Sequence, residues 1–393
     1  MALTKVDQTM VSDQVFGRRN LIINGDMRVA QRATSAAVSN GTNEGYATLD
    51  RWRHGLNNAA VATVSQSTTV PTGEGFANSM KIDVTTADTS VASNDFWVMV
   101  TKLEGQDLQR IKKGTSNAEK LTLSFWVRST KTGVYVVELV DNDNSSRAVS
   151  LSYTIASADT WQKVELTFPA DTTGVFDNNN EASLEIAWWL VGGSNYTSGT
   201  LATTWASQTD ANRAVGQVNF FDSTSNEYYI TGVQLEVGDK ATPFEHLTIG
   251  EELALCQRYF VSTAYPNNFQ ATHGVGGNEM ASYSTDGYWL YQGISYYGDG
   301  YAHDQYQLPV SMRARPTPIP YAPSGLVSGY AGGSTKLAAY GMTGGNEWRA
   351  ADITLFTWAG TPACSSFRVD YGVTDEDGTE GMWIGGFEFD AEF

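Results

Sequence analysis

The sequence predicts an all-β protein: a jelly-roll β-sandwich, a short linker helix, and then a second, smaller β-sandwich domain. Segments that alternate between apolar and polar residues recur from residue 20 to residue 237, and turn residues separate them. The chain also holds 19 Tyr, 16 Phe, 11 Trp and 38 Gly, while only 17% of its residues are charged. Aromatic residues suit half-buried strands and glycine suits turns, so both observations favour a sandwich.

Seven segments in the first part of the chain are expected to be strands. In residues 121–128 (LTLSFWVR), four apolar residues fall on one face at a period of two: Leu121, Leu123, Phe125 and Val127. Residues 133–140 (GVYVVELV) are followed by the polar turn cluster DNDN (residues 141–144). The other five segments are residues 79–84, 96–100, 161–168, 183–191 and 228–237.

A helix is predicted to divide the chain after these strands. Thr248 and Glu251 fit a capping box, and Leu253, Cys256 and Phe260 follow at helical spacing. Cys256 then lies on the apolar face of the helix, where we interpret it as buried packing and not as a reactive thiol.

Beyond the helix the sequence becomes aromatic and glycine-rich, which favours a second β-domain. The proline-rich segment 313–320 (RARPTPIP) predicts an extended edge strand or a crossover. At the end of the chain, residues 387–393 alternate between an apolar and an acidic face, which predicts a strand. The domain boundaries we expect are 1–19 for an N-terminal arm, 20–245 for the jelly roll, 246–262 for the linker helix and 263–393 for the C-terminal β-domain.

Charge and cysteine content exclude several classes of protein. The formal net charge is −18, and such a surface repels phosphate backbones, so we expect no nucleic-acid partner. The two cysteines, Cys256 and Cys364, are far apart and fit neither a zinc site nor a disulfide framework, which indicates synthesis in a reducing cytoplasm. We expect neither a signal peptide nor membrane insertion, because no apolar run has the required length.

Glycan binding is the sharpest functional hypothesis from the residues. Sugar rings pack on exposed aromatic planes, and the candidate residues are Trp188, Trp189, Tyr196 and Trp205. Since Trp188 and Trp189 are adjacent in an expected strand, they must face opposite ways. One of them then lies on the less buried face, unless it packs under the loop of residues 192–204 or into a subunit interface.

Catalysis and metal binding have weaker support. The four histidines are scattered outside any catalytic or metal-binding spacing, so we expect no enzyme, although the 43 Asp and Glu residues leave a glycosidase, as a glycan depolymerase, open as an alternative. Asp141 and Asp143 in the DNDN run are candidates for a structural calcium ion, but an Asx-rich turn explains them as well. No other cofactor is expected.

The run NLIINGDMRVAQR (residues 20–32), followed by LDRW (residues 49–52), resembles the opening of a module common in phage tail-fibre and virion structural proteins. The closing stretch of that module is matched by residues 230–260, and the initial MALTKV resembles the start of marine phage fibre and virion-appendage proteins. Residues 308–321 (LPVSMRARPTPIPY) and the final FEFDAEF are similar to a recurring C-terminal pattern. The middle of the module is similar to carbohydrate-binding jelly rolls.

The resemblance implies a non-enzymatic virion protein, a tail-fibre or head-fibre component that attaches to host surface glycans. We expect a homo-oligomer, a trimer, whose N-terminal arm binds other virion proteins and whose C-terminal domain contacts the receptor. A purely architectural role, as a capsid decoration protein or a tail adaptor, is the alternative. In both cases the protein is made in the host cytoplasm and resides in the virion.

Overall fold

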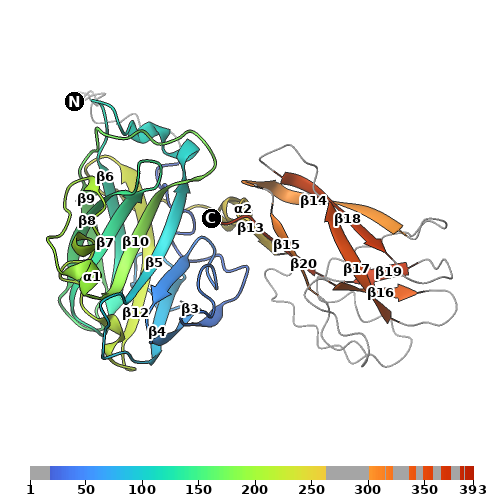
Figure 1. Ribbon diagram of the computed structural model, residues 1–393, viewed down its shortest axis with the longest axis horizontal. Helices are drawn as coiled ribbons and strands as arrows, with labels where there is room; N and C mark the ends of the chain where they lie inside the picture. The colour runs from blue at the N-terminus through green and yellow to red at the C-terminus, as the bar shows by residue number, and fades with distance from the viewer. Residues whose placement is uncertain are drawn as a thin grey trace, which may run out of the picture. The chain divides into compact units, whose positions relative to one another are not determined.

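The computed structural model describes residues 18–262 throughout, and beyond them 301–314, 316–321, 336–341, 348–356, 364–372, 381–384 and 386–393 (Figure 1). The chain forms two compact units, Met1–Glu252 together with Phe393, and Leu253–Glu392. The first 17 residues of the expected arm lie outside the described residues, whereas the backbone N–H groups of Arg19 and Asn20 both donate to Glu245 Oε2 at 2.8 Å.

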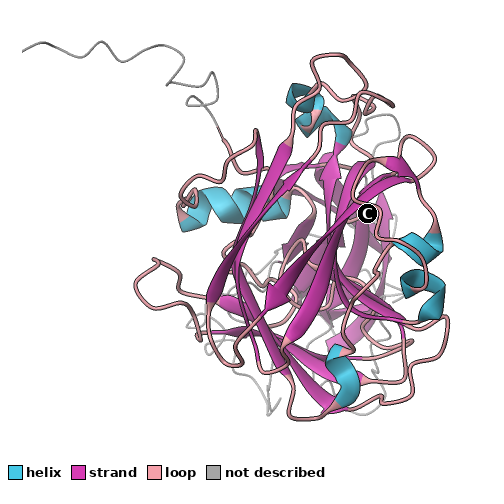
Figure 2. Ribbon diagram, turned by 90° about the vertical axis from the view of Figure 1, so that its left-hand side faces the viewer, coloured by secondary structure: helices cyan, strands magenta, loops and turns pink. Residues whose placement is uncertain are grey.

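The N-terminal unit is built from two antiparallel six-stranded sheets that face each other (Figures 1 and 2). The first sheet has the order β1 (Ser35–Val38), β3 (Val61–Ser67), β4 (Ser79–Thr86), β12 (Glu227–Val237), β6 (Leu121–Ser129) and β9 (Gln162–Phe168). The second sheet has the order β11 (Ala206–Ser207), β8 (Arg147–Ile155), β7 (Gly133–Asp141), β10 (Ala182–Gly192), β5 (Phe96–Glu104) and β2 (Arg53–Asn57). The predicted β-sandwich is confirmed.

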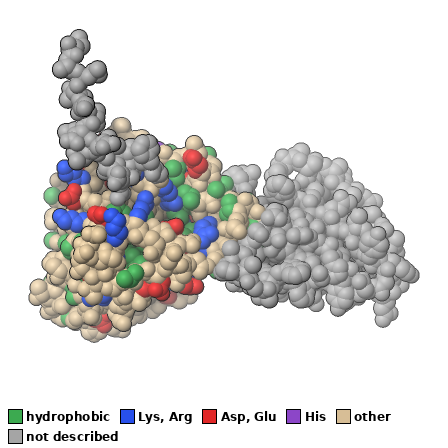
Figure 3. Space-filling model, turned by 90° about the horizontal axis from the view of Figure 1, so that it is seen from above, with side chains coloured by type: hydrophobic (Ala, Val, Ile, Leu, Met, Phe, Trp, Pro, Cys, Tyr) green, Lys and Arg blue, Asp and Glu red, His purple; other side chains and the backbone are tan. Residues whose placement is uncertain are grey.

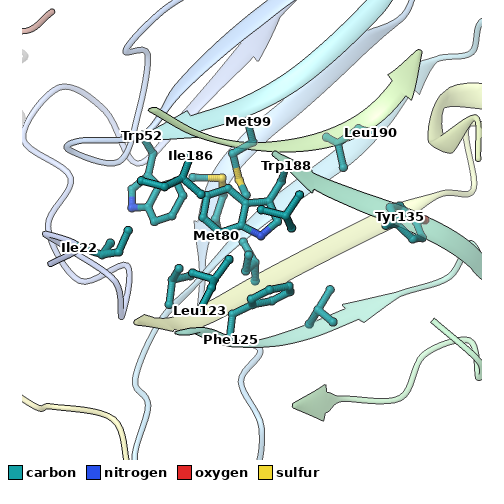
Figure 4. Packing of buried hydrophobic residues seen from close by; sticks show 14 of the residues in the cluster. Ile22, Trp52, Met80, Met99, Leu123, Phe125, Tyr135, Ile186, Trp188 and Leu190 are labelled. Atoms are coloured by element: carbon teal, nitrogen blue, oxygen red, sulfur yellow. The ribbon is translucent and has the colours of Figure 1, made fainter. Parts of the chain in front are cut away.

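Inward-facing side chains of the two sheets form one core between them (Figure 4). Trp188 from the second sheet lies 5.4 Å from Trp52, which precedes β2, and 5.9 Å from Phe125 of the first sheet, measured between ring centroids. The four apolar residues of LTLSFWVR are all buried, as their alternation predicts. Burying apolar surface on one face of each sheet is what stabilises such a sandwich.

All seven strands that the alternation predicts are present, as β4, β5, β6, β7, β9, β10 and β12. The sequence interpretation missed β1, β2, β3, β8 and β11. The two-residue β11 is too short to show any period. In the described part of the chain, none of the helices has the length and apolar character needed to cross a lipid bilayer.

The helix predicted at the domain boundary is α2 (Ile249–Gln257), and it begins with the capping box that the sequence indicates. The Glu251 carboxylate accepts from the backbone N–H and the hydroxyl of Thr248, at 2.9 and 2.7 Å, and Glu251 N donates back to Thr248 Oγ1 at 3.3 Å. Cys256 is buried, as expected. The helix is shorter than predicted, because residues 260–262 form strand β13 instead.

The C-terminal unit is also built from β-strands in two sheets (Figure 1). One has the order β13 (Phe260–Ser262), β20 (Gly386–Asp390) and β15 (Thr317–Tyr321). The other has the order β14 (Tyr301–Met312), β18 (Cys364–Gly372), β17 (Trp348–Phe356), β16 (Lys336–Gly341) and β19 (Gly381–Ile384). The proline-rich segment supplies the edge strand β15, where a missing backbone N–H costs least.

Candidate functional site

The two adjacent tryptophans of β10 are both buried, and the outward-facing one packs under the loop that follows the strand, which is one of the alternatives that the sequence left open. Trp188 has no exposed surface because it points into the core between the sheets. Trp189 points the opposite way, as the strand geometry requires, yet only 1% of it is exposed. The physical reason is that a loop covers this part of the outer face of the second sheet.

The covering loop runs from the end of β10 to Ala214 and includes the short helix α1 (Ser194–Thr197). The Tyr196 ring lies 5.3 Å from the Trp189 ring, and the Arg213 guanidinium lies 5.1 Å from the same ring. Arg213 also pairs with the buried Glu138 carboxylate at 2.9 Å, and Trp189 Nε1 donates to it at 3.3 Å. Burial raises the pKa of Glu138, and Arg213 partly offsets that effect. Trp189 is therefore a structural anchor for the loop.

The other two predicted aromatic residues are half-buried and lie apart from each other. Tyr196 contacts Phe96 edge to face at a centroid distance of 5.7 Å. Trp205 donates its indole N–H to the carbonyl of Pro169 at 2.8 Å, and Lys113 Nζ lies 5.3 Å from its ring. Hence the four predicted residues do not form one platform, and Tyr196 is the one that meets a further half-exposed aromatic ring.

Asp141 and Asp143, the candidate calcium ligands, have partners within the protein. Asp141 is buried and forms an ion pair with Lys113, and Asp143 Oδ2 accepts from the backbone N–H of Asp177 at 2.9 Å. Among the described residues, no group of three or more His, Cys, Asp or Glu side chains is placed to hold a metal ion. The structure thus gives Asp141 a different role from the calcium ligand that the sequence suggested.

A polar cavity of about 300 Å³ opens at one end of the sandwich. Three separate turns supply its lining: the turn after β1, the turn between β2 and β3, and the residue before β5. We call it the amide pocket, and its lining residues are Ser39, Asn40, Asn57, Asn58, Ala59, Ala60 and Asp95. Sequence reasoning missed this site because its parts are up to 56 residues apart (Ser39 to Asp95) and none of them forms a motif.

Hydrogen bonds fix the side chains of the amide pocket in place. Asn58 Nδ2 donates to Asp88 Oδ2 at 2.9 Å, and its Oδ1 accepts from Ala60 N at 2.9 Å. Asn57 Nδ2 donates to the carbonyl of Asn94 at 3.2 Å, and Asp95 Oδ2 accepts from Ala92 N at 2.8 Å. Each Asn carboxamide has two N–H donors and an oxygen that can accept two hydrogen bonds. The bonds within the protein therefore leave some donors and acceptors available to a ligand.

Half-buried aromatic rings stand beside the amide pocket. Phe96 follows Asp95 directly and is the antiparallel partner of Asn57, so its side chain adjoins the pocket wall. Tyr196 packs against it from the covering loop. We call Phe96 and Tyr196 the aromatic rim. A polar pocket and an aromatic surface are thus adjacent at this end of the second sheet.

A second group of aromatic residues lies on the outer face of the first sheet. Tyr229 is buried at the centre of this group, with the Arg128 guanidinium 5.0 Å and Lys81 Nζ 5.9 Å from its ring centroid. The half-buried Trp161 packs 6.2 Å from Tyr229. Lys81 bonds to Glu227 at 2.8 Å, which lowers the pKa of that carboxyl. Because cationic side chains lie over the Tyr229 ring, we interpret this group as surface packing.

Among the described residues, the titratable side chain in the lining of the amide pocket is that of Asp95. Asp95 is the only carboxylate that lines the pocket, whereas a glycosidase ordinarily uses two. His54 lies in the neighbouring core, where Trp97 Nε1 donates to its Nδ1 at 3.3 Å. Burial, with a contribution from Arg53, lowers the pKa of His54 to about 3, so it stays neutral and acts as a packing residue.

Basic and acidic side chains are interspersed on the face of the N-terminal unit seen in Figure 3.

No protein-family model matches the sequence, and no curated protein matches it. Among solved structures, the enzymatically active domain of tailspike protein 4 from bacteriophage CBA120 is 15% identical with a TM-score of 0.30, over 56% of this chain and 21% of that chain. The family 11 carbohydrate-binding module of Clostridium thermocellum is 12% identical with a TM-score of 0.27, over 55% of this chain and 99% of the module. The module TmCBM61, solved with β-1,4-galactotriose, is 11% identical with a TM-score of 0.27, over 56% of this chain and 99% of the module. This chain therefore spans about a fifth of the tailspike chain.

Proposed function

We propose that the N-terminal sandwich is a non-enzymatic glycan-binding module, and that the whole chain is a virion attachment protein that brings this module to a host surface. The observation that carries the first part is the position of the amide pocket directly beside the aromatic rim. The second part is supported by the resemblance of residues 20–32 and 230–260 to phage virion modules.

The chemistry of the site suits a sugar. Carboxamides donate to and accept from vicinal hydroxyl groups, and the apolar C–H face of a sugar ring packs on an aromatic surface such as Phe96. The cavity volume of about 300 Å³ lies at the lower end of the range for small-molecule sites, which suits one or two sugar residues. Since its bonds to Asp88 and Ala60 already orient Asn58, little ordering entropy is lost on binding.

The charge of the pocket indicates which sugars it binds. Asp95 is acidic, and neither Lys nor Arg is among the residues that line the pocket. An anionic sugar would meet like charge without a compensating cation, and this costs binding free energy. We therefore propose that the ligand is a neutral glycan.

The test is binding of the purified full chain to an array of neutral and uronic-acid oligosaccharides, followed by calorimetry on the retained sugars. Asn40 and Asn57 are the variants of choice, because both line the pocket and neither is in the core. Each Asn→Ala change removes hydrogen bonds worth about 0.5–1.5 kcal/mol, so the double variant should bind about tenfold or more weakly. Retention of only acidic sugars, or unchanged binding by the double variant, would contradict the proposal.

Trp161→Ala is the matched control, because this half-buried aromatic residue directly precedes β9 and packs against Tyr229 of the other sheet. It should bind the array like the wild type, and a loss of binding in this variant would move the site to the first sheet.

The proposal that the chain is a virion attachment protein has a separate test, which is antibody labelling of phage particles by electron microscopy. Label on the capsid shell alone would favour the architectural alternative over host attachment.

A further inference from the structure

Four charged side chains lie together near one end of the sandwich, three of them buried and the fourth, Arg147, partly buried. Lys113 follows a 3-10 turn (Gln109–Ile111), Asp141 ends β7, Arg147 begins β8, and Asp171 lies in the segment after β9. We call them the Lys113 cluster. The exposed fraction of the side chain is 2% for Lys113, 0% for Asp141 and 5% for Asp171.

The Lys113 nitrogen is held directly against the Asp141 carboxyl group. Nζ contacts Asp141 Oδ2, and it also donates to the carbonyls of Thr173 and Gly174 at 3.0 and 2.9 Å. The rings of Phe176 and Trp205 lie 5.1 and 5.3 Å from Nζ. An amine nitrogen and a carboxyl carbon are thus fixed next to each other in surroundings that exclude water.

The second oxygen of Asp141 lies among hydrogen-bond donors. Oδ1 accepts from Asp143 N at 3.0 Å, from Asn144 N at 3.2 Å and from Asn144 Nδ2 at 3.1 Å. Asn144 Nδ2 also donates to Oδ2, at 2.9 Å, so the donors directed at Oδ1 alone are the two backbone N–H groups. They can stabilise negative charge that develops on Oδ1 during attack on the carbon.

A second carboxylate touches the same nitrogen. Asp171 Oδ2 lies 3.1 Å from Lys113 Nζ, and Arg147 holds Asp171 by two hydrogen bonds of 3.0 Å. Thr173 N adds a third bond, to Asp171 Oδ1, at 3.0 Å. Asp171 is therefore oriented to take a proton from Nζ.

We propose that Lys113 and Asp141 condense to an intramolecular isopeptide bond, with Asp171 as the proton carrier. Nζ first passes one proton to Asp141 Oδ2, which leaves a neutral amine beside a neutral carboxylic acid. The amine lone pair then attacks Asp141 Cγ, and Oδ1 carries the negative charge of the tetrahedral intermediate. Asp171 takes the second proton from nitrogen and delivers it to Oδ2. The Cγ–Oδ2 bond breaks, water leaves, and Asp171 is ionised again.

Two features of the cluster favour this reaction over a permanent ion pair. Burial disfavours the charged pair relative to the neutral amine and acid, and fixed proximity replaces an intermolecular encounter. The exposed pair Lys131–Asp222 makes an equally close contact but has side chains 31% and 34% exposed, and it provides an internal comparison. There the charged pair stays hydrated, so no bond should form.

The test is intact mass spectrometry of the full-length protein, followed by peptide mapping with fragmentation. The wild type should be lighter than its sequence mass by one water molecule, and a branched peptide should join Lys113 to Asp141. Lys113→Arg keeps the positive charge but cannot form the amide, and Asp171→Asn removes the proton carrier, so both variants should have their full mass.

A wild-type protein of full mass would overturn the proposal and leave the cluster as an ion pair. A water loss that maps elsewhere would overturn it as well. A link between Lys131 and Asp222 would show that contact alone is sufficient, which contradicts the roles of burial and of Asp171. Since the measurement is made on the wild type, poor folding of a variant does not obscure the result.

Discussion

At the scale of single residues, β10 carries two neighbouring tryptophans that are buried in different ways, one between the two sheets and one under a loop. Trp188 is enclosed by side chains from both sheets, whereas Trp189 is covered by one loop and by Arg213. A cavity left in the core cannot be refilled easily, while a loop can settle onto a smaller side chain. The cost of truncation should therefore differ between two neighbours that are equally buried.

We predict that Trp188→Ala destabilises the N-terminal unit by about 3–5 kcal/mol, the usual cost of truncating a large aromatic residue in a core. Trp189→Ala should cost less, because the covering loop can adjust. Chemical denaturation followed by the remaining tryptophan fluorescence measures both. Equal losses in the two variants would show that the loop is as rigid as the core.

Acid sensitivity should come in part from Asp171. Burial alone would raise the pKa of this carboxyl, but hydrogen bonds from Arg147 and Lys113 outweigh burial and hold the pKa below its ordinary value of 3.8. A lowered pKa in the folded state means that stability is present above the unfolded pKa and is lost as the pH falls through the folded pKa.

The free energy of unfolding of the wild type should therefore fall below about pH 4. Asp171→Asn should be less stable at neutral pH, because Arg147 loses its partner, and should depend less on pH in the acid range. Urea titrations at a series of pH values test this, with Asp239→Asn at an exposed position as the control. An unchanged acid slope in Asp171→Asn would assign the effect to other carboxyl groups.

At the scale of elements, the sequence predicts the strands of the sandwich well where one face alternates cleanly. In β6 the apolar face is buried along the whole strand, so the period of two is visible in the letters. In β12 the same period is visible on either side of a bulge between Thr231 and Gln234. In contrast, β1 and β2 are short and contain few large apolar residues, so their pairing depends on partners that the local sequence does not show.

The functional site is harder to predict than the strands, for a physical reason. The amide pocket depends on the sheet register that brings Asn57 opposite Phe96, and on a turn from β1 that reaches the same place. The strand pattern shows that Trp188 and Trp189 point in opposite directions, but the cover over Trp189, which the sequence left open between a loop and an interface, becomes visible only in the folded chain. Tyr196 was named as a candidate from the sequence and is half-buried, whereas its ring neighbour Phe96 was not named.

Strand β20 is the element whose removal should matter most for the C-terminal unit. It lies between β13 and β15, and Phe389 and Ala391 are buried. The backbone of Ala391 also donates to the carbonyl of Tyr259 at 2.8 Å and accepts from Arg313 Nε at 2.6 Å. Deleting residues 387–393 should thus remove the pairing partner of two strands at once.

We expect this deletion to unfold the C-terminal unit and to leave the N-terminal sandwich folded. Limited proteolysis with mass analysis should show a protected fragment that ends near α2. Neutral amides in place of Glu388, Asp390 and Glu392, the acidic face that the sequence predicts for this segment, serve as the control, and this variant should keep the C-terminal unit folded because the apolar face and the backbone pairing are unchanged. Protection of the C-terminal unit in the truncated chain would show that β20 is dispensable.

At the scale of the whole molecule, the abundance of aromatic residues leads to a prediction about assembly. We expect a closed homo-oligomer, a trimer, because monomeric proteins rarely leave large apolar surfaces uncovered. Light scattering at micromolar concentration should give a mass near three times 42.7 kDa. A species of monomer mass under these conditions would rule out this mode of assembly.

The place of β12 in the first sheet has a consequence for synthesis. This strand begins at Glu227, yet it lies between β4, which ends at Thr86, and β6, which ends at Ser129. A nascent chain that has not yet released residue 237 from the ribosome therefore holds two unpaired strand edges and one open apolar face. Pairings between such distant segments form slowly, and open edges invite association with other chains. Solubility of the nascent protein should consequently change abruptly with chain length: fragments that stop before Glu227 should aggregate, and those that extend through Val237 should remain in solution.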